Sequence, residues 1–244
     1  MKTAPIKTAF ILGAGLGTRL APLTDIRPKP LLPVGGRPLI TYAMEHLLTV
    51  GVKRFIVNTH HLAHVYREVF AKSEWLGTPI VFCHEPVLLD TAGGLKNIEP
   101  LLTEDEEILV YNGDVVSDLP LAELVAAHRS GGREATLALR SSGSPLNVTL
   151  NEQGEICDFR GLLGEYGKNC LFAGIYVVRK SFLDRLAPGR KESVINVFLD
   201  MIKQTPGSLG GIIIGAGMWH DAGSPEEYER LDKMLTEKKG KPRD

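Results

Sequence analysis

The sequence predicts an α/β fold in which helices cover both faces of a mainly parallel sheet. Three observations predict it. Short apolar runs of strand length alternate with segments of helical period, glycine or proline marks many of the junctions, and no repeat or low-complexity linker divides the 244 residues. Continuous apolar runs are typical of strands that are buried on both faces, which occur where helices lie on both sides of a sheet.

The first half of the chain shows this alternation most clearly. We expect strands at 8–12, 53–57, 79–83, 107–111 and 135–139, and helices at 38–50, 62–71, 91–102 and 120–130. Pro38 suits a first helical turn and Gly51 suits a helix end. Sheets of this kind bind ligands at the carboxyl ends of their strands. The strand ends to consider are therefore 13–17, 58–61, 84–85 and 112–114.

After about residue 140 the pattern changes to shorter strands with turns between them. We expect strands at 148–150, 156–159, 171–178, 211–214 and 218–220, and helices at 182–186, 194–202 and 226–235. Residues 1–244 are expected to form a single domain with two parts, about 1–140 and about 141–244.

Composition excludes several classes of protein. The formal net charge is −1, so no overall field attracts nucleic acid or an anionic membrane. No run approaches the roughly 18 apolar residues that cross a bilayer, and the N-terminus does not resemble a signal peptide. The cysteines, Cys83, Cys157 and Cys170, lack a C-x-x-C spacing and favour no disulfide framework. We expect a cytoplasmic monomer or homodimer without a nucleic-acid or membrane partner.

The strongest chemical signal is the segment 13–34, GAGLGTRLAPLTDIRPKPLLPV, which follows the first expected strand. Its glycines allow a ligand to approach the backbone, and consecutive amides in such a turn can bind an anion. Arg19 adds a planar cation, and Lys29 is held between two prolines that limit where it can point. Together these groups can bind and neutralise a polyphosphate. The glycines concerned are Gly13, Gly15 and Gly17.

Two other phosphate-binding motifs do not fit this segment. The dinucleotide-binding fingerprint needs a glycine where Thr18 stands, and a Walker A loop needs a Gly-Lys-Ser/Thr run that is absent. The remaining alternative is a glycine-rich surface turn with scattered basic residues. Arg19 and the Pro-Lys-Pro run argue against that alternative.

The segment resembles the signature G-x-G-x-R-L-x-P-L-T…P-K-P-L-x-P-V of the sugar-nucleotide pyrophosphorylases, a nucleotidyltransferase family, and matches every fixed position. Asn112-Gly113-Asp114, residues 172–175 and the run Trp219-His220-Asp221-Ala222-Gly223 also have counterparts in that family. The resemblance implies a Rossmann-like, three-layer mixed sheet of the nucleotide-diphospho-sugar transferase type. It implies an enzyme that joins a nucleoside triphosphate to a sugar 1-phosphate and releases pyrophosphate, with the first part binding the nucleotide and the second binding the sugar.

The resemblance also implies roles for four charged residues. Asp114 and Asp221 would hold Mg²⁺, with a turn aspartate as the alternative for Asp114. Arg19 would bind the β- and γ-phosphates, and Lys29 would lie against the α-phosphate and the incoming sugar phosphate. A surface salt bridge is the alternative for either cation.

The base is expected at main-chain atoms near the first strand end. By resemblance, Glu85 and the run from Thr91 to Gly94 form a base-recognition turn, and a plain helix N-terminus capped by Thr91 is the alternative. The expected nucleotide-binding residues are Leu12, Gly13, Ala14, Gly15, Gly17, Thr18, Arg19, Lys29, Glu85, Thr91, Ala92 and Gly93.

The expected sugar site departs from the family. Many relatives place a Glu-Lys-Pro motif before the Phe-x-Gly-Ile strand, whereas this chain has Phe159-Arg160-Gly161 and no such lysine. Either Arg160 substitutes for that lysine, or the sugar phosphate is held differently. The expected sugar-binding residues are Asn112, Asn147, Arg160 and Gly174.

Several substrates remain open. We expect no C-terminal hexapeptide-repeat β-helix of the kind that many larger relatives carry. The short form resembles the N-acetylmuramate 1-phosphate uridylyltransferases and the short mannose-1-phosphate guanylyltransferases. By the same resemblance, the Thr-Ala-Gly-Gly turn favours UTP over GTP. Further alternatives are a cytidylyltransferase acting on phosphocholine or a similar phosphate, and a non-catalytic nucleotide-sugar-binding regulator. The four charged residues named above argue against the regulator.

Overall fold

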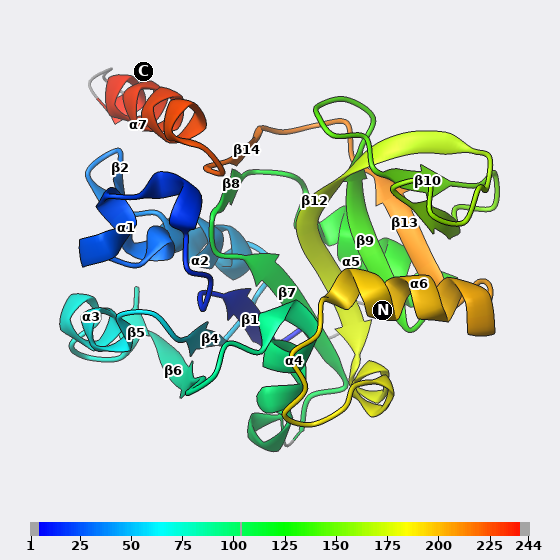
Figure 1. Cartoon of the computed structure of the whole chain (residues 1–244), viewed down its shortest axis with the longest axis horizontal. Helices are drawn as coiled ribbons and strands as arrows, with labels where there is room; N and C mark the ends of the chain where they lie inside the picture. Colours follow the sequence, from blue (N-terminus) through cyan, green and yellow to red (C-terminus); the bar gives the residue numbers. More distant parts are fainter. Residues whose placement is uncertain (1–4, 103, 240–244) are drawn as a thin grey trace.

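The computed structural model describes residues 5–102 and 104–239, and it confirms the α/β class (Figure 1). The central sheet has ten strands in the order β11-β10-β12-β7-β1-β4-β6-β5, with β9 beside β12 and β13 beside β9. Its strands are β1 Thr8–Leu12, β4 Arg54–Thr59, β5 Glu74–Trp75, β6 Thr78–His84, β7 Glu107–Asn112, β9 Ala135–Arg140, β10 Val148–Leu150, β11 Ile156–Phe159, β12 Lys168–Arg179 and β13 Leu209–Ile213.

The strands β1, β4, β6 and β7 run parallel, and β12 runs antiparallel to β7. The carboxyl ends of the parallel strands therefore meet at one edge, as the sequence predicts. Two small ladders lie outside the main sheet. They are β2 Pro33–Val34 with β3 Arg37–Pro38, and β8 Val115–Ser117 with β14 Trp219–Asp221.

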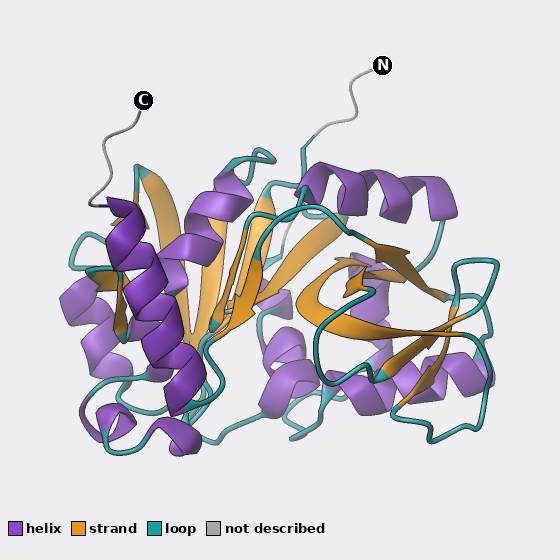
Figure 2. Cartoon of the chain, turned by 90° about the horizontal axis from the view of Figure 1, so that it is seen from above, coloured by secondary structure: helices purple, strands orange, loops and turns teal. Residues whose placement is uncertain are grey.

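Helices cover both faces of the sheet, as Figure 2 shows. The α-helices are α1 Leu23–Ile26, α2 Ile40–Leu48, α3 Ala63–Val69, α4 Asp90–Asn97, α5 Leu121–Gly131, α6 Val194–Gln204 and α7 Pro225–Lys239. The 3-10 helices are η1 Thr18–Leu20, η2 Lys29–Leu31, η3 Glu99–Leu101 and η4 Lys180–Arg185. In the described part of the chain, no helix combines the length and apolarity that crossing a membrane requires.

The apolar runs of the sequence arise because the parallel strands are buried on both faces. In β1, Ala9 and Ile11 pack into a core with α2, α3 and α5, whereas Phe10 packs into a second core with α4 and α6. A third, smaller core joins α7 to β2 and β8. Each face of a central strand therefore needs apolar side chains, which removes the alternation of half-buried strands.

Three predicted helices differ from those observed. The predicted helix 38–50 begins at Ile40, because Pro38 belongs to a short hairpin that turns at Gly35 and Gly36. The predicted helix 91–102 divides into α4 and η3, since Pro100 lies in the first turn of the 3-10 segment. The predicted helix 182–186 is the 3-10 helix η4. The division of the chain into nucleotide and sugar parts stays a prediction.

Candidate active site

A cavity of about 470 Å³ opens at the carboxyl ends of β1, β4 and β7. Ten expected residues line it: Leu12, Ala14, Gly15, Gly17, Thr18, Arg19, Lys29, Thr91, Asn112 and Asp114. Sequence reasoning did not name eight others as site residues: Leu16, Leu20, Pro30, Asn58, Leu88, Asp90, Lys191 and Gly223. Asn58 stands at a strand end that the sequence marked, so that signal could have found it.

Gly13 anchors the glycine loop to the neighbouring strand. Its N–H donates to Asn58 Oδ1 at 2.7 Å, and its carbonyl accepts from the Tyr66 hydroxyl at 2.8 Å. A β-carbon at position 13 would lie 2.7 Å from the Asn58 carbonyl oxygen, which only glycine avoids. Because the Gly13 N–H is already used, an anion nest in this loop must be formed by residues that follow it.

The rest of the loop packs against the lysine segment. Gly17 has φ 66°, and a β-carbon there would lie 2.8 Å from the Thr24 side chain and 3.0 Å from Lys29 Cβ. The Thr24 hydroxyl donates to the Gly17 carbonyl at 3.1 Å. At Gly15, by contrast, an added β-carbon would meet no atom within 4 Å, so this part of the backbone is open to the cavity. Glycine is therefore required at position 17 for packing, while position 15 leaves room for a ligand.

Lys29 connects the two candidate metal ligands. Its side chain is only 9% exposed, and its Nζ lies 2.5 Å from Asp114 Oδ2 and 3.7 Å from Asp221 Oδ1. The backbone holds it there in η2, between Pro28 and Pro30. A buried ammonium group needs such partners, because an unpaired charge in a protein interior is costly.

The small β8–β14 ladder brings the two aspartates together. Asp221 pairs in register with Val115, and the Ala222 N–H donates to the Asp114 carbonyl at 3.1 Å. The Trp219 indole N–H donates to the Ala173 carbonyl at 2.8 Å, which ties the ladder to β12. Two residues far apart in the chain therefore become neighbours at one end of the cavity.

Asp118 stabilises this ladder through hydrogen bonds to Met218. The Asp118 carboxylate accepts a hydrogen bond from the Met218 N–H, and the Asp118 N–H donates to the Met218 carbonyl at 3.1 Å. Asp118 therefore holds the start of β14 in place.

The groups around Asp221 leave one of its oxygens without a hydrogen bond. Burial raises the pKa of Asp221, the negative charge of Asp114 raises it further, and Lys29 and Arg19 oppose the increase. Among the described residues, nothing makes a hydrogen bond to the buried Asp221 Oδ1. This carboxylate can therefore gain from a bound cation.

The two carboxylates of Asp114 and Asp221 suit Mg²⁺, which also takes ligands from substrate and water, better than a metal ion coordinated by protein side chains alone. Within residues 5–102 and 104–239, no group of three or more His, Cys, Asp or Glu side chains converges on one point. Asp114 and Asp221 are two carboxylates beside an open cavity. Mg²⁺ commonly takes one or two carboxylates together with substrate phosphates and waters.

Glu85 lies behind the cavity and does not line it. It is fully buried, its Oε1 accepts from Asn58 Nδ2 at 2.7 Å, and its Oε2 accepts from the Leu89 N–H at 3.0 Å. Each oxygen thus accepts one protein N–H, and contact of this side chain with a base stays a prediction. Through Asn58, Glu85 connects the turn before α4 to the anchored Gly13.

The turn at the start of α4 is covered by a distant segment. The N–H groups of Ala92 and Gly93 donate to the Glu192 carbonyl at 2.9 and 3.3 Å, and neither residue lines the cavity. Thr91 does line it, but its hydroxyl accepts from the Val194 N–H at 2.7 Å and does not cap α4. Most of this expected recognition turn is therefore used for packing against the segment before α6.

Of the expected sugar-binding residues, Asn112 alone lines the cavity in the described structure. Gly174 has φ 72°, and a β-carbon there would lie 2.6 Å from Asn112 Nδ2, so this glycine makes room for Asn112. Arg160 is exposed and its N–H donates to the Asn147 carbonyl at 2.8 Å, away from the cavity lining. Lys191, which the sequence did not single out, lines the cavity instead.

The comparisons with known sequences agree with one another. A family model described as nucleotidyl transferase matches residues 8–238. The mannose-1-phosphate guanylyltransferase of Mycobacterium tuberculosis is 33% identical over 226 residues, which cover 91% of this chain and 62% of that relative. Other curated relatives, 30–34% identical, carry names of the same activity, and none of these names mentions a uridylyltransferase. The chain thus spans about 62% of the length of such relatives.

Solved structures share the fold at low sequence identity. The inositol-1-phosphate CTP transferase from T. maritima superposes with a TM-score of 0.79 at 20% identity, over 98% of this chain and 99% of that chain. A UDP-glucose pyrophosphorylase from Acinetobacter baumanii gives 0.80 at 18% identity, over 97% and 95%. The similarity confirms the predicted sheet architecture. With the family model matching almost the whole described chain, it follows that this chain belongs to the nucleotidyl transferase family.

Proposed function

We propose that this chain is a Mg²⁺-assisted guanylyltransferase that joins GTP to a sugar 1-phosphate, with mannose 1-phosphate as the acceptor, and releases pyrophosphate. The observation that carries the proposal is the placement of Lys29 between Asp114 and Asp221 beside an open glycine loop. The choice of GTP and mannose rests on the names of the curated relatives. Those names support the guanylyltransferase alternative over the uridylyltransferase that the sequence favours.

The main physical obstacle to this reaction is charge, because both substrates are anions that repel each other. Phosphoryl and nucleotidyl transfers demand positioning and neutralisation rather than covalent chemistry by the protein. Lys29 and Arg19 line the cavity on the side of the two aspartates and can neutralise the triphosphate there. Bound Mg²⁺ would add further positive charge against the phosphate oxygens.

In the proposed reaction, a phosphate oxygen of the sugar 1-phosphate forms a bond to the α-phosphorus of GTP. The bond from that phosphorus to the bridging β-phosphate oxygen breaks, and pyrophosphate leaves in line. No general base is needed, since a phosphate monoester is already ionised at neutral pH. In this scheme Arg19 holds the departing phosphates, Lys29 contacts the α-phosphate, and Asp114 with Asp221 holds the metal.

The acceptor phosphate needs a cation of its own, and we propose Lys191 for that role. It lines the cavity from the segment between η4 and α6, whereas Arg160 does not. Asn112, which also lines the cavity, can hydrogen-bond a sugar hydroxyl with its amide. This arrangement would replace the lysine of the missing Glu-Lys-Pro motif.

A pyrophosphate-release assay tests the proposal. The panel combines GTP, UTP, CTP and ATP with mannose 1-phosphate, glucose 1-phosphate, N-acetylmuramate 1-phosphate and phosphocholine, each with Mg²⁺ or with EDTA. We expect the highest kcat/KM with GTP and mannose 1-phosphate, and loss of release in EDTA. Preference for UTP with N-acetylmuramate 1-phosphate, or for CTP with phosphocholine, would replace the proposal by that alternative. Binding of nucleotide sugars without release from any pair would indicate the regulator.

A further inference from the structure

A network of buried polar groups lies behind the β8–β14 ladder that brings the two candidate metal ligands together. We infer that His46 is a positioning residue for these ligands, because its two ring nitrogens hold both ends of the segment 111–119, which contains Asp114. The inference rests on the proposed function and adds a residue that does not itself line the cavity.

His46 lies in the last turn of α2, and this helix packs against β8 (Figure 1). Its residue is only 8% exposed, its Nδ1 lies 3.0 Å from the Tyr111 hydroxyl, and its Nε2 lies 2.7 Å from the Leu119 carbonyl oxygen. The imidazole also stands edge-on to the Tyr111 ring, with 5.8 Å between the two centroids. One side chain therefore contacts a residue before Asp114 and a residue after β8.

The Leu119 carbonyl determines the tautomer of His46. A carbonyl oxygen only accepts, so Nε2 carries the hydrogen and donates it to Leu119. Burial lowers the pKa of His46, while the Leu119 carbonyl and Asp118 oppose the decrease, and the neutral ring is favoured. In a neutral imidazole Nδ1 is then an acceptor, and the Tyr111 hydroxyl donates to it. Each ring nitrogen thus makes one hydrogen bond, in opposite directions.

Ser117 closes these contacts into a ring of four residues, which we call the His46 network: His46, Tyr111, Ser117 and Leu119. The Leu119 N–H donates to Ser117 Oγ at 3.1 Å. Burial raises the pKa of the Tyr111 hydroxyl, and a hydrogen bond from the Ser117 side chain opposes that increase. All four residues are buried, so the loss of one member leaves its neighbours unsatisfied away from water.

The His46 network holds the segment that presents Asp114. Tyr111 lies in β7 before Asp114, and Ser117 is the last residue of β8 after it. The Asp114 carbonyl in turn accepts from the Ala222 N–H at 3.1 Å, next to Asp221. A shift of this segment would therefore change the separation of the two carboxylates, and groups that orient metal ligands in this way commonly affect metal affinity.

The ladder by itself gives weak support for this geometry. Strands β8 and β14 pair through three residues each and form a separate sheet of two strands, and such a sheet is marginal without further packing. On the β14 side, the Trp219 indole is tied to β12 through the Ala173 carbonyl. On the β8 side, His46 provides the corresponding polar support from α2.

The test is the variant His46→Phe, which keeps an aromatic ring against Tyr111 and removes both hydrogen bonds. Because the segment 111–119 loses its polar support, we expect the Mg²⁺ concentration for half-maximal turnover to rise by about 10- to 100-fold. The KM for mannose 1-phosphate should change little. His46→Gln, whose amide carries both a donor and an acceptor, should recover part of the Mg²⁺ affinity.

His128→Phe is the matched control, because His128 is also fully buried and also lies 3.0 Å from a hydroxyl, that of Thr136. Both variants should lower the Tm, which a purely structural role would also cause, but only His46→Phe should raise the Mg²⁺ requirement. If His46→Phe does not fold, Tyr111→Phe removes the hydroxyl alone and should raise that requirement in the same direction. A wild-type Mg²⁺ requirement in the folded variant would overturn the inference.

Hydrogen exchange separates this inference from the proposed function, since it needs neither metal nor turnover. In His46→Phe, the N–H groups of Asp118 and Ala222, which join β8 to β14, should exchange about 10-fold faster or more. The Gly13 N–H, bonded to Asn58, should keep its wild-type rate. If no substrate pair releases pyrophosphate, the proposed function fails, but these rates still test whether His46 holds the ladder. Unchanged exchange at both amides would contradict the inference.

Discussion

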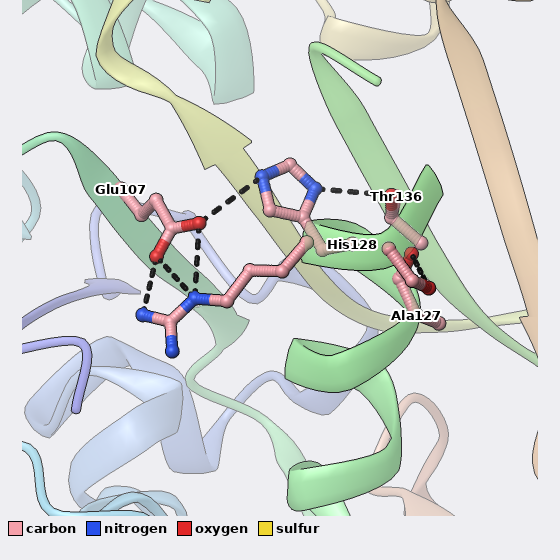
Figure 3. Close-up of polar contacts among 6 residues, drawn as sticks. Glu107, Ala127, His128 and Thr136 are labelled. Atoms are coloured by element: carbon pink, nitrogen blue, oxygen red, sulfur yellow. Dashed lines mark hydrogen bonds and ion pairs between the residues drawn. The ribbon is translucent and has the colours of Figure 1, made fainter. Parts of the chain in front are cut away.

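The two ends of β7 both carry ion pairs, but the pairs are built differently. At the amino end, Glu107 is held by Arg129, whose Nε and Nη2 donate to its carboxylate at 2.8 and 2.5 Å (Figure 3). Beyond the carboxyl end, Lys29 serves both Asp114 and Asp221, and one buried oxygen of Asp221 has no hydrogen bond in the described structure.

The difference separates structural support from function. The Glu107–Arg129 pair matches a carboxylate with a forked cation and fixes α5 to the sheet. The Lys29 cluster leaves two carboxylates to share one lysine, beside a cavity. Substitutions at the carboxyl end should therefore alter turnover, and those at the amino end should alter stability.

The largest expected effect follows from Lys29→Ala. Removal of the ammonium group leaves Asp114 and Asp221 without their shared partner and removes a charge that we place at the α-phosphate. Loss of one such electrostatic contact typically lowers kcat by about 10²–10³-fold. Steady-state kinetics with GTP and mannose 1-phosphate measures it, and Lys53→Ala, at an exposed lysine, is the control. Near-normal turnover with an intact melting transition would contradict the role of Lys29.

Asp221→Asn should separate activity from stability. Because burial and Asp114 raise the pKa of Asp221, its ionised form is disfavoured in the folded protein, and a neutral amide relieves that cost. We expect an unchanged or higher Tm, together with about a 10- to 100-fold increase in the Mg²⁺ concentration for half-maximal turnover. The exposed Asp184→Asn is the matched control. An unaltered Mg²⁺ requirement would remove Asp221 from the metal site.

The sequence singled out Lys29, Asp114 and Asp221 because their signals are local, and the roles assigned to them stay predictions. Lys29 lies within one continuous motif, and Asp114 follows a strand whose buried run is evident. Asp221 stands two residues after Trp219 in a recognisable run, although the ladder that brings it to Asp114 has only three residues in each strand. The β2–β3 hairpin was missed for the same reason, since its strands have two residues each, but Gly35-Gly36 was a usable turn signal.

The part of the site near α4, which includes Lys191, could not be predicted from local sequence patterns. Lys191 reaches the cavity because the carbonyl of the next residue, Glu192, accepts from the N–H groups of Ala92 and Gly93 in α4. That contact joins segments about a hundred positions apart in the sequence, and neither segment has a pattern that identifies the other. The sequence instead offered Arg160 as a substitute for the missing lysine, and Arg160 is exposed on the turn after β11.

Lys191→Ala should have a smaller effect than the two substitutions above and can be compared directly with Arg160→Ala. Loss of a hydrogen bond to a charged phosphate should raise the KM for the sugar phosphate by about 10-fold, with a smaller change in kcat. Arg190→Ala, next to it in the chain and 65% exposed, is the matched control. If Arg160→Ala raises that KM and Lys191→Ala does not, the acceptor phosphate is held as the sequence first suggested.

The smallest expected effect lies at the amino end of β7, where His128 is buried beside the Glu107–Arg129 pair. Its Nδ1 lies 3.0 Å from the Thr136 hydroxyl, and its Nε2 lies 3.9 Å from Glu107 Oε1 (Figure 3). Burial lowers the pKa of His128 to about 4, Glu107 opposes this decrease, and Arg179 and Arg129 add to it. Below the unfolded pKa of about 6.5, the unfolded chain therefore binds a proton that the folded protein does not.

His128 thus contributes stability that is fully present above about pH 6.5 and is lost as the pH falls through about 4. Tm measured between pH 7 and pH 4.5 should fall more steeply in wild type than in His128→Gln, which cannot be protonated, while kcat at pH 7.5 should be the same in both proteins. Parallel Tm profiles would show that His128 titrates alike in the folded and unfolded chains. A change in kcat would mean that the two ends of β7 are coupled, and that the separation between structural support and turnover does not hold.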